Sequence, residues 1–348
     1  MELEFSSLNP KIRWGGAIAS LLLFCTLIFY TIILSWNITC IHSDQIVVIP
    51  KGSSVNGTIQ LIQENGCLSD SDVRVLKLAM TVTLRNGKVI PGRYTFKGIL
   101  TLGNMINLIT TSSRERKKVT LLEGWTIEQI ADELHRRLQI DTYKFISLSK
   151  DFNFIHSLNI DAPSIEGFLF PDTYIFLSSY TEEQIITIMV NQFFHNYKKY
   201  IKRFKGHTSL SMREITTLAS IIQGEAMYDD EMPIISSVYH NRLKRKMFLQ
   251  ADPTIQYIVP GKNRRLYNKH LRVDSPYNTY KYKGLPPGPI NNPGLSALKA
   301  AIHPADSNFL YFVADGEGRH IFTRNNEEHN EAKKVLKRKR QEMKRKKK

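Results

Sequence analysis

A glutamate at the end of a predicted helix is the residue whose position most suggests chemistry. Ser211 and Glu214 have the spacing of a capping box, which marks a helix start. Apolar residues then recur at helical spacing as far as Ile222, so that Glu225 projects at the edge of the apolar face. A carboxyl that is partly removed from water has a raised pKa and can act as a general acid near neutral pH.

The structural alternative for this glutamate is an ion pair. Arg213 and Arg242 are the candidate partners, and a frayed helix end is a further explanation. Gly224 precedes the glutamate and has no side chain, so another segment could approach the backbone closely there. Both interpretations of Glu225 stay open on this stretch of sequence.

Extended segments are predicted elsewhere in the C-terminal two thirds of the chain. The stretch 275–294 is rich in Pro, Gly and Asn, which excludes a helix, and its many aromatic residues argue against disorder. Residues 164–176 place four aromatic side chains around a Pro-Asp pair. Residues 310–323 alternate around an Asp-Gly turn, which predicts a β-hairpin.

The N-terminal half of the sequence predicts an α+β fold. Strand–glycine–helix patterns occur at 45–65, 91–109 and 119–134, and they are too irregular for a solenoid. Small α+β modules account for such a pattern. The polar segment 110–118 is the predicted linker.

The region before residue 37 has the composition of a membrane anchor. No charged residue lies between Trp14 and Trp36, and a helix of that length can cross a bilayer. Two basic residues precede it, which places the N-terminus inside. The run is too long for the apolar part of a usual signal peptide. We expect a cytoplasmic segment at 1–13, a transmembrane helix at 14–36, and the rest of the chain outside the cytoplasm.

The net charge of +16 is concentrated at the C-terminus. Residues 331–348 contain eleven Lys or Arg and two Glu, which account for nine of the sixteen charges. A block of this kind is usually a solvated arm that meets a polyanion. Nucleic acid is not expected, because residues 333–348 contain no aromatic side chain that could stack on bases.

Cysteine and histidine usage predicts neither a metal site nor a cofactor. The chain contains no CxxC or HExxH motif, and its ten His are scattered. Cys25 lies in the predicted anchor. Cys40 and Cys67 lie beyond it and could either pair in an oxidising compartment or remain as free thiols.

Eight motifs follow one another along the chain. They are EGW (123–125), EGFLFPDTY (166–174), LASIIQGEA (218–226), VYHNRL (238–243), LQADPT (249–254), SPYNTY (275–280), GLPPGPINNPG (284–294) and AIHPADSNFLYFVADGEGRHIFT (301–323). This succession resembles the YceG-like, or MltG, endolytic murein transglycosylases over roughly residues 45–332. The resemblance implies a LysM-like α+β module at 45–117 and a mixed α+β catalytic domain at 118–332. The basic tail at 333–348 lies outside the family pattern.

The resemblance places the family's catalytic glutamate at Glu225. Many members carry a second acidic residue two positions earlier, where this chain has Gln223, which supports Glu225 as the catalytic member. Around it we predict a sugar-binding cleft, since aromatic faces and neutral polar groups suit pyranose rings and their substituents. The predicted substrate-binding residues are Glu166, Phe170, Asp172, Tyr174, Asn241, Gln250, Asp252, Thr254, Tyr277, Asn278 and Thr279. Core packing is the alternative for the aromatic residues, and a helix cap or Asx turn for Asp252.

The implied reaction cleaves the β-1,4 bond between N-acetylmuramic acid and N-acetylglucosamine, and leaves a 1,6-anhydro end. One carboxyl can serve as acid and then as base in such a reaction, whereas an ordinary glycosidase needs two. We expect an enzyme of the bacterial cytoplasmic membrane that limits the length of nascent glycan strands beside wall-synthesis proteins. The alternatives are a hydrolase that recruits Asp252 or Asp172, and a noncatalytic peptidoglycan-binding scaffold.

Overall fold

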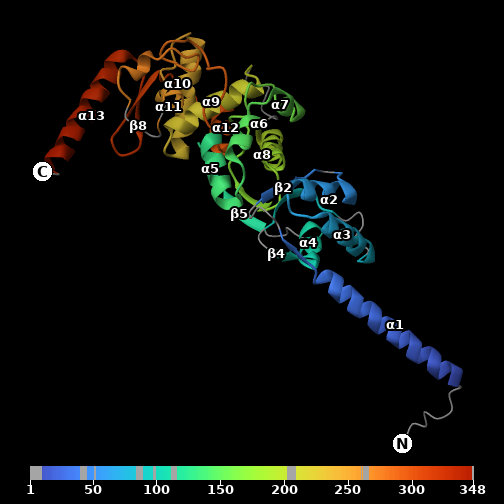
Figure 1. Cartoon of the computed structure of the whole chain (residues 1–348). Helices are drawn as coiled ribbons and strands as arrows, with labels where there is room; N and C mark the ends of the chain where they lie inside the picture. Colours follow the sequence, from blue (N-terminus) through green and yellow to red (C-terminus); the bar gives the residue numbers. More distant parts are fainter. Residues whose placement is uncertain are drawn as a thin grey trace, which may run out of the picture. The chain divides into compact units, whose positions relative to one another are not determined.

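The chain folds into two compact units, which are coloured along the sequence in Figure 1. The computed structural model describes residues 10–346 except 40–44, 51, 84–88, 97–98, 111–115, 202–208, 260 and 262–265. The first unit comprises Met1–Lys117 and Phe176–Thr181, and the second comprises Lys118–Ile175 and Glu182–Lys348. Both units mix helices with strands, and the strands pair in two-stranded sheets. The predicted α+β class is therefore confirmed.

The first unit begins with α1 (Pro10–Leu34), a helix of 25 residues. It projects from the other elements of its unit and meets them at its C-terminal end, where Ile33 is buried and Leu34 packs over Gly103. The side chains from residue 18 to residue 32 are exposed. Taking the described residues together, no helix combines the length and the apolar character that crossing a membrane requires.

Two antiparallel strand pairs and three helices complete the first unit. β1 (Asn37–Thr39) pairs with β4 (Ile99–Thr101), and β2 (Gln45–Ile49) pairs with β3 (Gly92–Phe96). The helices are α2 (Val55–Glu64), α3 (Asp70–Val82) and α4 (Leu102–Thr110). Ser54 and Ser69 cap the first two by accepting hydrogen bonds from backbone N–H groups of the first turn. Apolar side chains from all these helices and from β2 and β3 meet in a single core.

Two predictions for this region concern cysteines and a linker. Cys67 is a buried free thiol, and Cys25 is an exposed one. Cys40 lies outside the described residues, as does most of the predicted linker at 110–118.

The segment Phe176–Thr181 belongs to the first unit although the chain on both sides of it belongs to the second. Ser179 is buried, and its carbonyl oxygen lies 2.6 Å from the place that a Cβ on Gly92 would occupy. Gly92 has a φ of +154°, so the conformation and the close contact both require glycine at the start of β3.

The second unit is built around α9 (Met212–Glu225), whose predicted capping box is confirmed. Every residue from 215 to 222 is buried, so the helix is enclosed on all sides and not on one face as the sequence pattern predicts. Its polar residues tolerate this because Thr216, Thr217 and Ser220 donate their hydroxyls to helix carbonyls. Three helices pack against α9, namely α10 (Met232–Lys244), α11 (Asp252–Ile258) and α12 (Leu295–Ile302).

Other helices, strands and turns complete the described part of the chain. They are β5 (Arg116–Thr120), α5 (Ile127–Leu138), α6 (Thr142–Leu148), α7 (Phe152–Ser157), β6 (Thr173–Leu177), α8 (Glu182–Asn196), the π-helical η1 (Tyr197–Ile201), the 3-10 turns η3 (Asp229–Glu231) and η4 (His270–Arg272), β7 (Tyr311–Ala314), β8 (His320–Thr323) and α13 (Asn326–Lys346). β7 and β8 form the predicted hairpin, with Tyr311 opposite Thr323. The stretch 275–294 contains no helix, as predicted.

The basic tail continues a helix of the second unit. α13 packs against β7 and β8, and Ala332 and Leu336 on its inner side are both buried. The basic side chains at 333, 334, 337 and 338 are exposed. The tail is therefore a helical extension whose first turns are held by apolar contacts.

Candidate active site

Glu225 is the last residue of α9, and its carboxyl lies among polar side chains of α10 and α11. Tyr239 of α10 donates its hydroxyl to Glu225 Oε1 over 2.8 Å. Asp252, the first residue of α11, and Arg242 of α10 lie near enough to act on the carboxyl electrostatically. Within the described part of the chain Glu225 forms no ion pair, so the salt bridge to Arg213 or Arg242 that the sequence allows is not made.

The surroundings of Glu225 raise its pKa to about 7. Burial is the largest cause, and the negative charge of Asp252 acts in the same direction. The hydrogen bond from Tyr239 and the positive charge of Arg242 oppose it. The negative end of the helix dipole adds to the upward shift, because Glu225 occupies the last position of α9. Near neutral pH the carboxyl therefore populates both its acid and its base form.

The close approach predicted at Gly224 is confirmed. A Cβ at this position would lie 2.7 Å from Cβ of Pro253 and 2.9 Å from its Cγ, so no larger residue fits without moving α11. The contact brings the first turn of α11 against the last turn of α9. Asp252 and Glu225 are held near one another for that reason.

The start of α11 is fixed by the segment that includes residues 278–280. The hydroxyls of Thr254 and Thr279 lie 2.9 Å apart, and Thr279 Oγ1 accepts a hydrogen bond from Ala251 N. Tyr280 donates its hydroxyl to Asp252 Oδ1 over 2.6 Å. The side chain of Gln250 is exposed immediately before the helix, on a residue with a φ of +48°.

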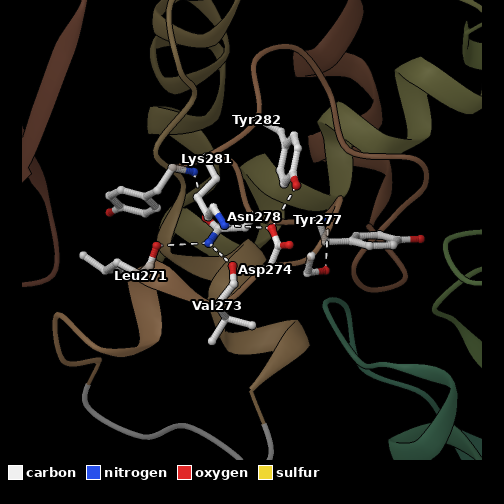
Figure 2. Close-up of polar contacts among 9 residues, drawn as sticks. Leu271, Val273, Asp274, Tyr277, Asn278, Lys281 and Tyr282 are labelled. Atoms are coloured by element: carbon white, nitrogen blue, oxygen red, sulfur yellow. Dashed lines mark hydrogen bonds and ion pairs between the residues drawn. The ribbon is translucent and has the colours of Figure 1, made fainter.

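Asn278 organises the loop that carries these groups. Its Nδ2 donates to the carbonyls of Leu271 and Val273, at 3.0 and 2.7 Å, and its Oδ1 accepts from Tyr280 N (Figure 2). Asn278 and Thr279 are both buried. Their polar atoms therefore hold the loop in place, whereas the prediction assigned them to substrate.

Tyr277 lies on the same loop and packs at 5.2 Å from the ring of Tyr257. Its hydroxyl lies against Gly288, where a Cβ would be 3.2 Å away. On the outer side of the loop, Asp274 accepts hydrogen bonds from Lys281 and Tyr282, which Figure 2 shows converging on one carboxyl.

Asn241 and Arg242 brace the segment between α12 and β7. Asn241 Nδ2 donates to the carbonyls of Ser307 and Phe309, at 2.8 and 3.0 Å. Arg242 is buried and donates to the carbonyls of Leu310, Phe248 and Leu249. The guanidinium thus joins several loops and leaves its charge close to Glu225.

Glu166 is a second buried carboxyl, and it serves a different arrangement. Its Oε1 accepts from Asn292 Nδ2 at 2.8 Å and its Oε2 accepts from Ile127 N at 3.3 Å. Asn292 also accepts from the N–H groups of Gly167 and Leu169 through Oδ1, at 2.9 Å each. Burial raises the pKa of Glu166 to about 8. Both oxygens are engaged inside the protein, so this carboxyl ties the EGW and EGFLFPDTY motifs to the segment around Asn292.

The predicted aromatic platform lies mostly in the core. Phe170 and Tyr174 are 7 % and 8 % exposed, and the Tyr174 hydroxyl donates to the Phe170 carbonyl over 2.6 Å. Asp172 is exposed and accepts from Gln192 and from its neighbour Thr173. The core-packing alternative therefore describes these two aromatic residues.

Several residues near Glu225 were not predicted. Tyr239 and Tyr280 each donate a hydroxyl to one of the two site carboxylates. Gln223 Oε1 accepts a hydrogen bond from Gly294 N, and the side chain of Gln223 is also hydrogen-bonded to Glu123. A Cβ on Gly294 would overlap the carboxyl of Glu123. Helical spacing could have indicated one of these residues, because Tyr239 is three residues before Arg242 and lies on the same face of α10.

The comparisons with known proteins identify the family. The YceG-like family model matches residues 47–335, and the chain belongs to this family. An endolytic murein transglycosylase of Bacillus subtilis is 33 % identical over 304 residues, which is 82 % of each chain. One from Streptococcus pneumoniae is 32 % identical over 237 residues, which is 61 % of this chain and 43 % of the relative. A crystal structure described as a YceG-like protein of Listeria monocytogenes is 30 % identical, with a TM-score of 0.58 over 83 % of this chain and 99 % of that one.

Proposed function

We propose that this protein is an endolytic murein transglycosylase with Glu225 as its catalytic residue. The names of its relatives support the activity, and the family match covers the segments that surround Glu225. The observation that carries the assignment of the residue is a half-buried carboxyl whose pKa is about 7, at the point where α9, α10 and α11 meet. The substrate is the glycan strand of peptidoglycan.

The proposed reaction uses this one carboxyl twice. In its acid form, Glu225 gives its proton to the glycosidic oxygen while the bond from that oxygen to the muramyl anomeric carbon breaks. The muramyl 6-hydroxyl then forms a new bond to the same carbon, and its proton passes to the Glu225 carboxylate. The products are a free 4-hydroxyl on one fragment and a 1,6-anhydro ring on the other, and Glu225 ends protonated as it began.

The groups beside Glu225 suit a developing positive charge on the sugar. Asp252 is exposed and accepts a hydrogen bond from the hydroxyl of Tyr280 through Oδ1, and Gln250, two residues earlier, is exposed as well. We infer that Gln250 and Asp252 contact substrate directly. Thr254, Asn278 and Thr279 act on it through the loop that they hold.

Product analysis tests this function. The full-length protein is incubated with purified glycan strands in water enriched in ¹⁸O, and the released ends are identified by mass. Anhydro ends without ¹⁸O are expected from a transglycosylase, and Glu225→Gln should not release them. Reducing ends that carry ¹⁸O would instead identify a hydrolase, for which Asp252 is the candidate second carboxylate because it lies near Glu225. Glycan binding without any cleavage would identify a scaffold.

We further propose that α1 anchors the protein in the bacterial cytoplasmic membrane, with both units outside the cytoplasm. Support comes from its 25 residues, from the exposed apolar side chains along it, and from the two basic residues that precede residue 14. The β2–α2–α3–β3 order, whose apolar side chains meet in the core of the first unit, supports a LysM-like module within residues 45–117. We include in this proposal that the anchored protein contacts wall-synthesis proteins.

A reporter fusion tests the topology. An enzyme that is active only outside the cytoplasm, fused after residue 348, should be active in cells. Activity from a cytoplasm-dependent reporter at that position would reverse the proposed orientation.

A further inference from the structure

Tyr239 makes one contact that the proposed mechanism has not used. The side chain is buried, with 1 % of its surface exposed, and its hydroxyl donates to Oε1 of Glu225 over 2.8 Å. Among the described residues, no hydrogen bond is formed by Oε2 of the same carboxyl. One oxygen of Glu225 is therefore held by the protein, and the other is left for a substrate.

The ring of Tyr239 is itself held from outside α10. Phe312 of β7 meets it edge-on at 5.9 Å, with the ring planes at 90°. His320 of β8 contacts Phe312 at 5.1 Å. Glu231 accepts hydrogen bonds from His320 N and pairs with its ring nitrogen, at 2.9 and 3.2 Å. The β7–β8 hairpin thus fixes the tyrosine, and through it the carboxyl.

Among the described residues, the charged or titratable groups that act on Glu225 come from three segments. Tyr239 and Arg242 of α10 stabilise its anion, Asp252 of α11 destabilises it, and Tyr280 of the following loop interacts with it as well. Tyr239 is the member of this set that touches the carboxyl directly. Because it donates a proton to the bond, its hydroxyl favours the ionised form of Glu225.

We propose that Tyr239 is the positioning residue of this active site, which turns the Glu225 carboxyl so that Oε2 is the oxygen that exchanges protons with the glycan. The proposal rests on the proposed function. Tyr239 also lowers the upper end of the working pH range, because its hydrogen bond favours the ionised form of Glu225 and a free enzyme that starts as an acid loses activity when Glu225 ionises.

The test compares two tyrosine-to-phenylalanine variants of the full chain. Tyr239→Phe keeps the ring but removes the bond to Glu225. Tyr282→Phe is the matched control, because it removes a tyrosine-to-carboxylate bond of the same 2.8 Å length, to Asp274 on the exposed outer side of the loop. Release of anhydro ends is followed from pH 5 to pH 9, and the Glu225 carboxyl is titrated by ¹³C NMR, with Glu225→Gln to assign its signal.

We expect Tyr239→Phe to lower kcat roughly tenfold or more at pH 6, because the carboxyl is no longer oriented, with little change in KM. The alkaline limb of its pH–rate profile should move to higher pH, and the pKa of Glu225 measured by NMR should rise as well. Tyr282→Phe should match the wild type in kcat, in KM, in the position of the alkaline limb and in the Glu225 titration. If the rate falls while the alkaline limb of the pH–rate profile and the pKa of Glu225 stay where they are in the wild type, Tyr239 has a purely structural role and the proposal is overturned.

The proposed function and the role of Tyr239 can fail separately. If the wild type releases no anhydro ends, the proposed function is wrong, while the NMR titration still decides whether Tyr239 acts on Glu225. If the wild type releases them and Tyr239→Phe behaves like Tyr282→Phe, only the role of Tyr239 is wrong.

Discussion

Glu166 and Glu225 are both carboxyls whose pKa is raised by burial, yet their surroundings differ in kind. Glu166 is 3 % exposed and both of its oxygens accept hydrogen bonds from inside the protein. Glu225 is half-buried and has one oxygen held by Tyr239. The pKa is raised further at Glu166, to about 8 against about 7. A raised pKa therefore does not identify the reactive carboxyl, whereas a raised pKa with an available oxygen does.

The largest effect is expected from replacing Glu225, because, of the two carboxyls, only this one is proposed to take part in the reaction. Glu225→Gln keeps the size of the side chain and removes the exchangeable proton, so release of anhydro ends should fall by about 10²–10⁴-fold. The midpoint of thermal unfolding should stay close to that of the wild type. Mass analysis of the products and circular dichroism would measure the two quantities. Near wild-type release would remove Glu225 from the mechanism.

The second prediction concerns the partner of Glu166. Asn292→Ala removes the acceptor for Gly167 N and Leu169 N and the donor to Glu166, and all of these groups are buried. We expect the free energy of unfolding to fall by about 3 kcal/mol or more, measured by urea denaturation.

The neighbouring asparagine supplies a control for this variant. Within the part of the chain that the structure describes, the side chain of Asn291 donates one hydrogen bond, to Ser220 O, and its buried Oδ1 has no partner. Asn291→Ala should therefore cost less stability than Asn292→Ala. Equal losses would mean that the bonds around Asn292 do not account for its importance.

A third prediction uses the pH dependence of stability. The pKa of Glu166 is higher in the folded protein than in the unfolded chain, so folding binds a proton between about pH 4.5 and pH 8. Its contribution is fully present below pH 4.5 and is lost as pH rises toward 8, by up to roughly 5 kcal/mol. Glu166→Gln cannot ionise, so its unfolding midpoint should fall less steeply over this range, although one lost hydrogen bond lowers it at pH 5. If the unfolding midpoint of Glu166→Gln fell with pH as steeply as that of the wild type, the pH dependence would not come from Glu166.

The smallest effect is expected at the C-terminus. Truncation after residue 338 keeps Ala332 and Leu336, which pack α13 against the hairpin, and removes a strongly basic segment. Binding to anionic vesicles should weaken at low salt and differ little at high salt, while turnover of soluble glycans should change little. Replacing the same basic residues by Gln, at full length, is the control for chain length. If the truncated variant and the Gln variant both lost turnover of soluble glycans, the basic segment would be part of the active site.

The sequence predicted the parts of the fold that local signals specify. The capping box at Ser211, the helix of the 119–134 pattern and the hairpin at 310–323 all occur where their motifs lie. α3 was missed although it begins with a capping box of its own at Ser69. The enclosure of α9 was missed because Thr and Ser among its residues resemble an exposed face until their bonds to helix carbonyls are known.

The site was predicted less completely, because it depends on contacts between distant segments. Glu225 could be chosen from its place on a helix and from its motif. Asn292 and Glu166 are 126 residues apart and Tyr280 and Asp252 are 28 apart, and no helical or strand period relates such pairs. The same polar types serve substrate binding and loop bracing, so Asn278 and Thr279 could not be assigned from composition.

The placement of residues 176–181 in the first unit has a consequence for synthesis. That unit begins at the N-terminus, yet 58 residues of the second unit, Lys118–Ile175, are translated before its last segment. The contact between Ser179 and Gly92 of β3 can therefore form only after Ser179 has left the ribosome. A chain stopped after Lys117 would lack this piece of its own first unit, and the first unit cannot be completed until Lys118–Ile175 of the second unit have been made.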